Sequence, residues 1–153
     1  MKIIKNLIPA VLVLFFTNCG FSPIYTNIEN ENLNINIVNS NGSIEINNLI
    51  KIKFSELMNG ETKNNFDVEL NSQYKKETLT KNTAGDTTDY RLNLEVIFTT
   101  KIKDRLEKFV YQEKSDMKKK DSAFEEEKYE NILKREMVNL ITEKFITQLI
   151  ISK

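Results

Sequence analysis

Five apolar side chains alternate with polar ones between residues 90 and 98, and this period of two constrains the fold more than any other feature. The apolar set is Tyr90, Leu92, Leu94, Val96 and Phe98. Arg91, Asn93 and Glu95 fall between them. Because successive side chains of a strand point to opposite faces, the segment predicts a β-strand with one face in a core and one in water.

The preceding segments supply two more strands and a helix. Alternation recurs over 33–38 and 66–74, and the clusters at 39–43 and 80–86 are rich in turn-forming residues. Apolar residues at helical spacing predict an amphipathic helix over 46–58, with Ser43 as its N-cap and Gly60 just past its end.

The last third of the chain predicts a turn, a fourth strand and a long helix. Residues 101–104 are the turn, and the strand over 106–113 alternates too weakly to set its register. A charged connector over 114–121 precedes Ser122 and Glu125, which have the spacing of a capping box. The helix then runs to about residue 151, with an apolar face of Leu133, Met137, Leu140, Ile141, Phe145 and Leu149.

The element order β-α-β-β-β-α predicts an α+β fold. Two helices would pack on one face of a four-stranded mixed sheet. The first helix lets strand one run parallel to a neighbour by a crossover, and the later strands form a meander.

The N-terminus predicts an export signal that ends at the only cysteine of the chain. Lys2 and Lys5 precede an uncharged apolar run over 7–16, about half of the roughly 20 residues that a membrane span needs. Cys19 follows this run and indicates the signal of a bacterial lipoprotein, in which the thiol is alkylated with diacylglycerol and becomes the first mature residue. Two alternatives remain open: an ordinary secreted protein with a spare thiol, and a buried cysteine behind an uncleaved anchor.

The residues just before Cys19 depart from the usual lipoprotein signal, with Asn18 and Phe16 where a small residue and Leu are typical. With cleavage there, the chain divides into a signal peptide over 1–18, a lipidated tether over 19–32 and a single α+β domain over 33–153. The expected covalent groups are diacylglycerol and an N-acyl chain on Cys19, with no other cofactor.

Composition and charge exclude several classes of function. The mature chain carries 20 basic and 22 acidic residues, which gives no reason to expect nucleic acid as a partner. The sequence contains no histidine, so its own residues cannot form a Ser-His-Asp triad or a His-ligated zinc site. We therefore expect no enzyme activity and no metal site.

Each charged cluster can be explained either by a structural role or by a functional one. Acids at Asp121 and 125–127 fit a solvated helix start, where negative charge is favourable, better than a metal site. The run of three lysines over 118–120 fits a solvent-exposed loop better than a phosphate site. Lys101, Lys103 and Arg105 share one predicted hairpin tip, so they are expected to project together and are the candidate contacts for an anionic glycolipid.

One segment resembles a known family. Cys19-Gly20-Phe21-Ser22-Pro23-Ile24-Tyr25 is similar to the start of the mature lipopolysaccharide (LPS)-assembly lipoproteins of the LptE family, whose alphaproteobacterial members commonly begin Cys-Gly-Phe-x-Pro-Leu-Tyr. The predicted element order also matches that family. The chain departs from it in its low arginine content and in the Lys/Glu-rich connector.

The resemblance implies a lipoprotein anchored to the outer membrane on its periplasmic side by Cys19. Its domain would plug the β-barrel of the LPS translocon (LptD), assist barrel assembly and contact LPS during insertion. Lys101, Lys103 and Arg105 would be the LPS contacts. The alternative is a pilotin or periplasmic adaptor lipoprotein that binds only protein.

Overall fold

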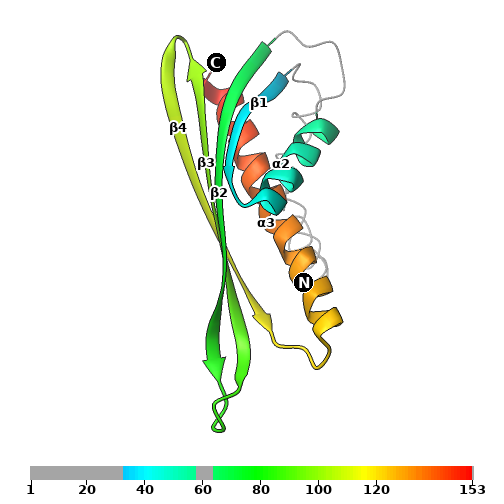
Figure 1. Cartoon of the computed structure of the whole chain (residues 1–153). Coiled ribbons are helices and arrows are strands. Elements are labelled where there is room, and N and C mark those ends of the chain that lie inside the picture. The colour runs from blue at the N-terminus through cyan, green and yellow to red at the C-terminus, as the bar shows by residue number, and fades with distance from the viewer. Residues whose placement is uncertain (1–32, 58–63, 153) are drawn as a thin grey trace, which may run out of the picture.

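The structure, a computed structural model, describes residues 33–57 and 64–152, and its elements form two layers (Figure 1). A twisted sheet makes one layer, and two helices cover one face of it. The elements in chain order are β1 (Leu33–Gly42), α2 (Ile44–Leu57), β2 (Asn64–Lys81), β3 (Thr87–Ile102), β4 (Arg105–Lys118) and α3 (Ala123–Ser152). The predicted signal peptide, the predicted tether and Cys19 lie outside the described residues.

The strands lie side by side in sequence order, β1-β2-β3-β4. β1 pairs with β2 in parallel, and β2, β3 and β4 pair as an antiparallel meander. The predicted α+β fold, with its four-stranded mixed sheet and two helices on one face, is confirmed.

The predicted alternation of β3 separates the two faces of the sheet. Even-numbered side chains from Leu92 to Ile102 are buried against the helices, whereas their odd-numbered neighbours reach the open face. The register carries this division to the other strands, because directly paired residues of an antiparallel sheet point to the same side. Leu94, for example, pairs with Tyr74 of β2 and with Glu113 of β4.

The core gathers around the C-terminal half of α3. The Phe145 ring stacks on Phe98 of β3 at a centroid distance of 4.1 Å, and Phe54 of α2 lies 6.1 Å from Phe145. Phe109 and Tyr111 of β4 meet the same ring edge-on. One aromatic side chain thus contacts both the sheet and the other helix.

Three details differ from the sequence-based prediction, and a fourth prediction, the end of the first helix, is not tested. The predicted connector over 114–121 is strand as far as Lys118, because β4 stays paired with β3 as far as Asp89 and buries Met117. β1 likewise continues through the predicted turn cluster to Gly42. Leu140 is 44 % exposed instead of buried. The first helix ends at Leu57, and its predicted end at 58–60 lies outside the described residues.

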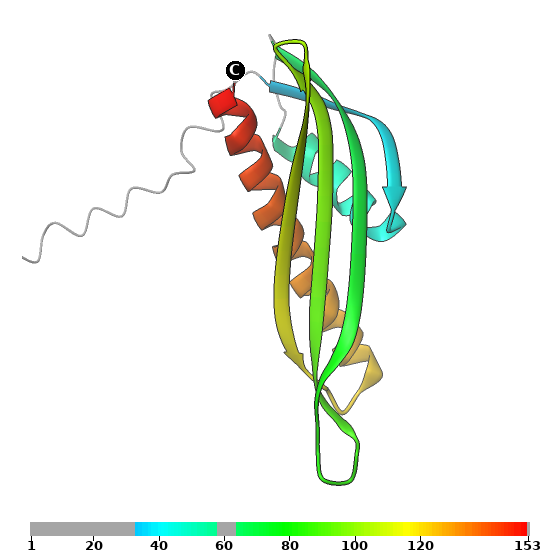
Figure 2. The same cartoon turned by 90° about the vertical axis from the view of Figure 1, so that its left-hand side faces the viewer.

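The two ends of the sheet are built differently. At one end, β2 and β3 continue as a two-stranded extension, residues 78–88, that reaches past the start of α3 (Figure 2). We call it the far hairpin. At the other end lie the β3–β4 turn, the start of β1 and the end of α3 (Figures 1 and 2).

No helix within the described part of the chain has the length and apolar character needed to cross a membrane.

Candidate functional site: the β3–β4 tip and the helix–sheet ion network

The three candidate cations lie at the tight turn between β3 and β4. Lys103 and Asp104 form the turn with φ values of +48° and +63°, and Ile102 pairs directly with Arg105. This is the two-residue hairpin geometry in which both central residues are left-handed. The predicted hairpin tip at 101–104 is therefore present, and all three cations are exposed there.

The three cations do not share one face. Lys101 pairs with Leu106, so its side chain lies on the open face. Arg105 pairs with the buried Ile102 and lies on the helix side. Lys103 and Arg105 line one hollow together with Ile102, Glu107, Phe109, Gln148 and Ser152. The expectation that the three project together therefore holds for Lys103 and Arg105, and Lys101 flanks the turn from the other side.

The hollow adjoins the C-terminal end of α3. The last turn of that helix contains no basic residue. Cations are favourable near the carbonyl end of a helix, so Lys103 and Arg105 also complement the partial negative charge of α3. This is a structural role that these two side chains can fill without any ligand.

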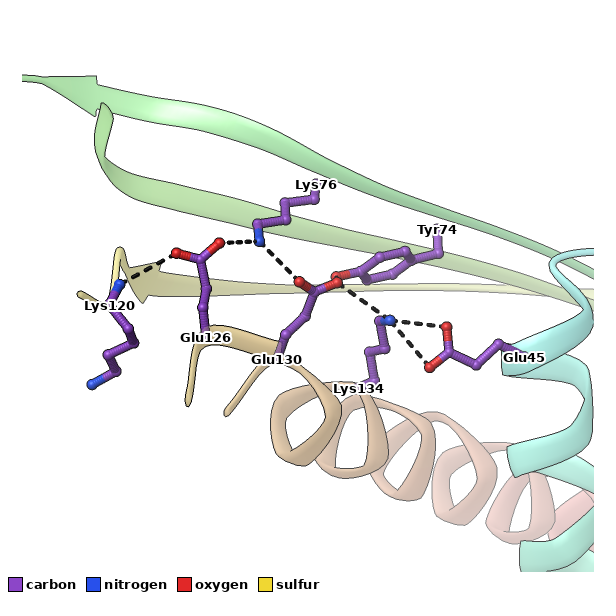
Figure 3. Close-up of polar contacts among 7 residues, drawn as sticks. All are labelled: Glu45, Tyr74, Lys76, Lys120, Glu126, Glu130 and Lys134. Carbon is purple, nitrogen blue, oxygen red and sulfur yellow. Dashed lines mark hydrogen bonds and ion pairs between the residues drawn. The ribbon is translucent and has the colours of Figure 1, made fainter. Parts of the chain in front are cut away.

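A second polar cluster joins the N-terminal half of α3 to the sheet and to α2 (Figure 3). Lys76 of β2 donates to Glu126 at 2.8 Å and to Glu130 at 2.9 Å. Lys134 lies 3.2 Å from Glu130 and 2.9 Å from Glu45 of α2. We call this cluster the helix–sheet ion network; it consists of Glu45, Tyr74, Lys76, Glu126, Glu130 and Lys134.

Hydrogen bonding has a larger effect than burial on the pKa of Glu130, the central acid of this network. Burial alone would raise the pKa of Glu130, but hydrogen bonds from Lys76, Tyr74 and Lys134 lower it below its usual value. The Tyr74 hydroxyl donates to Glu130 at 2.7 Å, and burial together with this carboxylate raises the pKa of Tyr74. Lys134 is only 8 % exposed and lies over the Tyr74 ring. The network is therefore charged and internally paired at neutral pH.

The helix–sheet ion network was not predicted, although the sequence contains a signal for it. The sequence predicts solvated acids at the start of α3. Glu125 and Glu127 are indeed exposed, but Glu126 is paired with Lys76. Tyr74 and Lys76 fall in register with the core face of β2, where a polar side chain needs a partner. That requirement could have predicted acids facing them from a helix.

The open face of the sheet is polar and largely paired across strands. Arg91 binds Asp116 through two hydrogen bonds of 2.8 and 2.9 Å. Further cross-strand bonds join Asn93 to Glu77, Gln112 to Glu95 and Asn36 to Asp67. A shallow hollow across β2, β3 and β4 is lined by Gln73, Lys75, Glu77, Asn93, Leu94, Glu95, Gln112, Glu113 and Lys114.

Among the described residues, no cluster of three or more acids, cysteines or histidines is placed to hold a metal ion.

The fold is similar to that of a solved lipoprotein. The crystal structure of rare lipoprotein B from Shewanella oneidensis superposes with a TM-score of 0.58 at 18 % sequence identity, covering 78 % of this chain and 93 % of that one. At this identity the likeness concerns the fold. No protein-family model and no curated protein matches the sequence.

Proposed function

We propose that the chain is an outer-membrane lipoprotein of LPS assembly, anchored by acyl chains on Cys19. Two independent features of the chain together support this proposal. The segment Cys19–Tyr25 resembles the start of mature LptE proteins. The domain that follows has a fold similar to that of rare lipoprotein B. The N-terminal segment resembles a lipoprotein start and the fold resembles that of a lipoprotein, so two separate parts of the chain support the same proposal.

In this proposal the domain plugs the LPS-translocon barrel, LptD, and assists its assembly. The lumen of a large outer-membrane barrel is polar. The open face of the sheet suits such surroundings, because it presents paired charges and amides such as Arg91–Asp116 and Glu95–Gln112. An apolar open face would instead favour contact with lipid chains or aggregation.

The domain also contacts LPS in this proposal, with Lys101, Lys103 and Arg105 as the candidate contacts. None of the three forms an ion pair with an acid in the described part of the chain. Unpaired, exposed cations are suited to phosphate groups, which accept charge-assisted hydrogen bonds.

The test is a pull-down of the acylated protein from outer membranes, with the bound partner identified by mass. We expect the LPS-transport barrel in near-equal amount. Cys19→Ser should lack the acyl mass and be lost from the membrane fraction, since two or more acyl chains are needed for stable anchoring. Recovery of a secretin instead would indicate a pilotin, and recovery of no barrel would refute the proposal.

A further inference from the structure

We infer that the β3–β4 turn is a membrane-docking tip that binds the anionic phospholipid surface of the leaflet holding the acyl anchor. The docking tip consists of Lys101, Lys103, Arg105 and Leu106. The inference rests on the proposed function in one respect, the acylation of Cys19. It assigns to the same three cations, together with Leu106, a phospholipid surface that barrel plugging does not require and that is distinct from LPS.

The tether enters the domain at the same end as the docking tip. Ile37 pairs with Val68, Val68 with Thr100, and Thr100 with Glu107. Leu33 lies four residues before Ile37 in a strand that runs parallel to β2, so it is level with the β3–β4 turn. Figures 1 and 2 show the start of β1 and this turn at one end of the sheet, and the far hairpin at the other.

The length of the tether brings this end of the domain near the lipid. Leu33 lies 14 positions after Cys19, and a chain of this length spans at most about 50 Å when fully extended. The 16 residues of β3 span about 53 Å. The docking tip is therefore the end closest along the chain to the acyl chains, and the far hairpin is about one strand length more distant.

The arrangement of the three cations is better suited to binding a flat membrane surface than to binding a single small anion. Lys101 and Arg105 lie on opposite faces of the hairpin, with Lys103 between them in the turn. Side chains on opposite faces cannot converge on one phosphate, but all three meet a flat surface that approaches the turn end-on. Residues 101–108 carry four cations and two acids, so the tip is attracted to anionic head groups.

Apolar side chains at this end add the second component of interfacial binding. Leu106, next to the turn, is 70 % exposed, and Ile151 in the last turn of α3 is 72 % exposed. Cations combined with exposed apolar side chains are typical of protein segments that lie in the head-group region. The paired, polar open face of the sheet lacks this combination around Arg91 and Glu95.

The experiment uses the acylated mature protein reconstituted in vesicles, with a fluorophore on Leu106→Cys and a quencher on the lipid head groups. A matched variant carries the fluorophore on Leu79→Cys in the far hairpin, where the native side chain is 37 % exposed. We expect quenching at 106 to exceed that at 79 when phosphatidylglycerol is present, and the difference to vanish in neutral phosphatidylcholine. Each cation replaced by glutamine should lower the equilibrium constant of the contact about fivefold.

Equal quenching at the two positions, or quenching that does not depend on phosphatidylglycerol, would overturn the inference. Quenching at 106 with LPS in the vesicles but not with phosphatidylglycerol would also overturn it, while supporting the proposed LPS contact. Flotation with neutral vesicles reports the anchor alone, so failure of acylation is recognised separately. Unchanged circular dichroism of the triple variant Lys101→Gln, Lys103→Gln, Arg105→Gln excludes misfolding as the cause of any loss.

Discussion

Gly42 adopts a left-handed conformation, φ +90°, where β1 ends and α2 begins. The next residue, Ser43, donates its backbone N–H to the Ser72 carbonyl at 3.0 Å. The buried Ser72 hydroxyl in turn bonds to Asn47 of α2 at 2.7 Å. This junction connects the first strand, the first helix and the second strand through one short segment of backbone.

At the residue scale, Gly42→Ala should destabilise the domain by about 3 kcal/mol, because strain and a steric clash add together. A Cβ at this position would lie 1.8 Å from the Ser72 carbonyl oxygen. Urea unfolding followed by circular dichroism measures the loss.

Gly85 provides the matched control, since it has the same φ of +90° but no atom within 4 Å of an added Cβ. Gly85→Ala should cost about 1 kcal/mol, the strain alone. Equal losses for the two variants would show that the close approach at Gly42 has no energetic consequence.

At the element scale, α3 is held to the sheet in two ways. Its C-terminal half packs in the aromatic core through Phe145, whereas its N-terminal half is held by Glu126 and Glu130 of the helix–sheet ion network. Core packing does not depend on pH, but a network of carboxylates does. The two halves of one helix should therefore respond differently to acid.

We expect the free energy of unfolding to fall as the pH drops below about 4.5. The pKa of Glu130 and that of Glu126 lie lower in the folded protein than their usual value. A lowered pKa stabilises the folded state above the unfolded value, and this stabilisation is lost as the pH falls through the folded value. Urea unfolding at a series of pH values between 7 and 3 measures the slope.

Glu130→Gln should give a shallower acid slope than the parent protein, because one of the shifted carboxyls is absent. Glu127→Gln is the control, since that neighbouring acid is exposed and forms no ion pair in the described structure. A parent slope retained in Glu130→Gln would mean that the network does not couple pH to stability.

At the scale of the whole molecule, the Phe145 ring connects the two layers. It contacts β3, β4 and α2 through Phe98, Phe109, Tyr111 and Phe54. Removing it should leave a cavity that no single element can collapse to fill, because its walls belong to different elements.

Phe145→Ala should lower the free energy of unfolding by about 4 kcal/mol, from lost burial and the remaining cavity. Phe124 in the same helix is 74 % exposed, and Phe124→Ala should change stability by less than about 0.5 kcal/mol. Thermal and urea unfolding of both variants measure the difference. A small effect at 145 would contradict the assigned core.

Elements whose physical signal is local can be predicted from the amino-acid sequence. The alternation from Tyr90 to Phe98 predicts β3 and its buried face, and apolar residues at helical spacing predict both helices. Together with the element order these signals predict the α+β fold and a turn at 101–104; the structure has the turn at 103–104, with 101 and 102 still in β3.

Features that depend on pairing between distant segments could not be predicted from the sequence, because they form only when those segments meet in the fold. The polar stretch over 114–118 looks like a loop, and pairing with β3 makes it a strand because that satisfies its backbone hydrogen bonds. Register with Ile102 and Leu106 places Arg105 and Lys101 on opposite faces. The acids that pair with Lys76, and Glu45 that pairs with Lys134, lie far away along the chain, so these ion pairs form only when the layers meet.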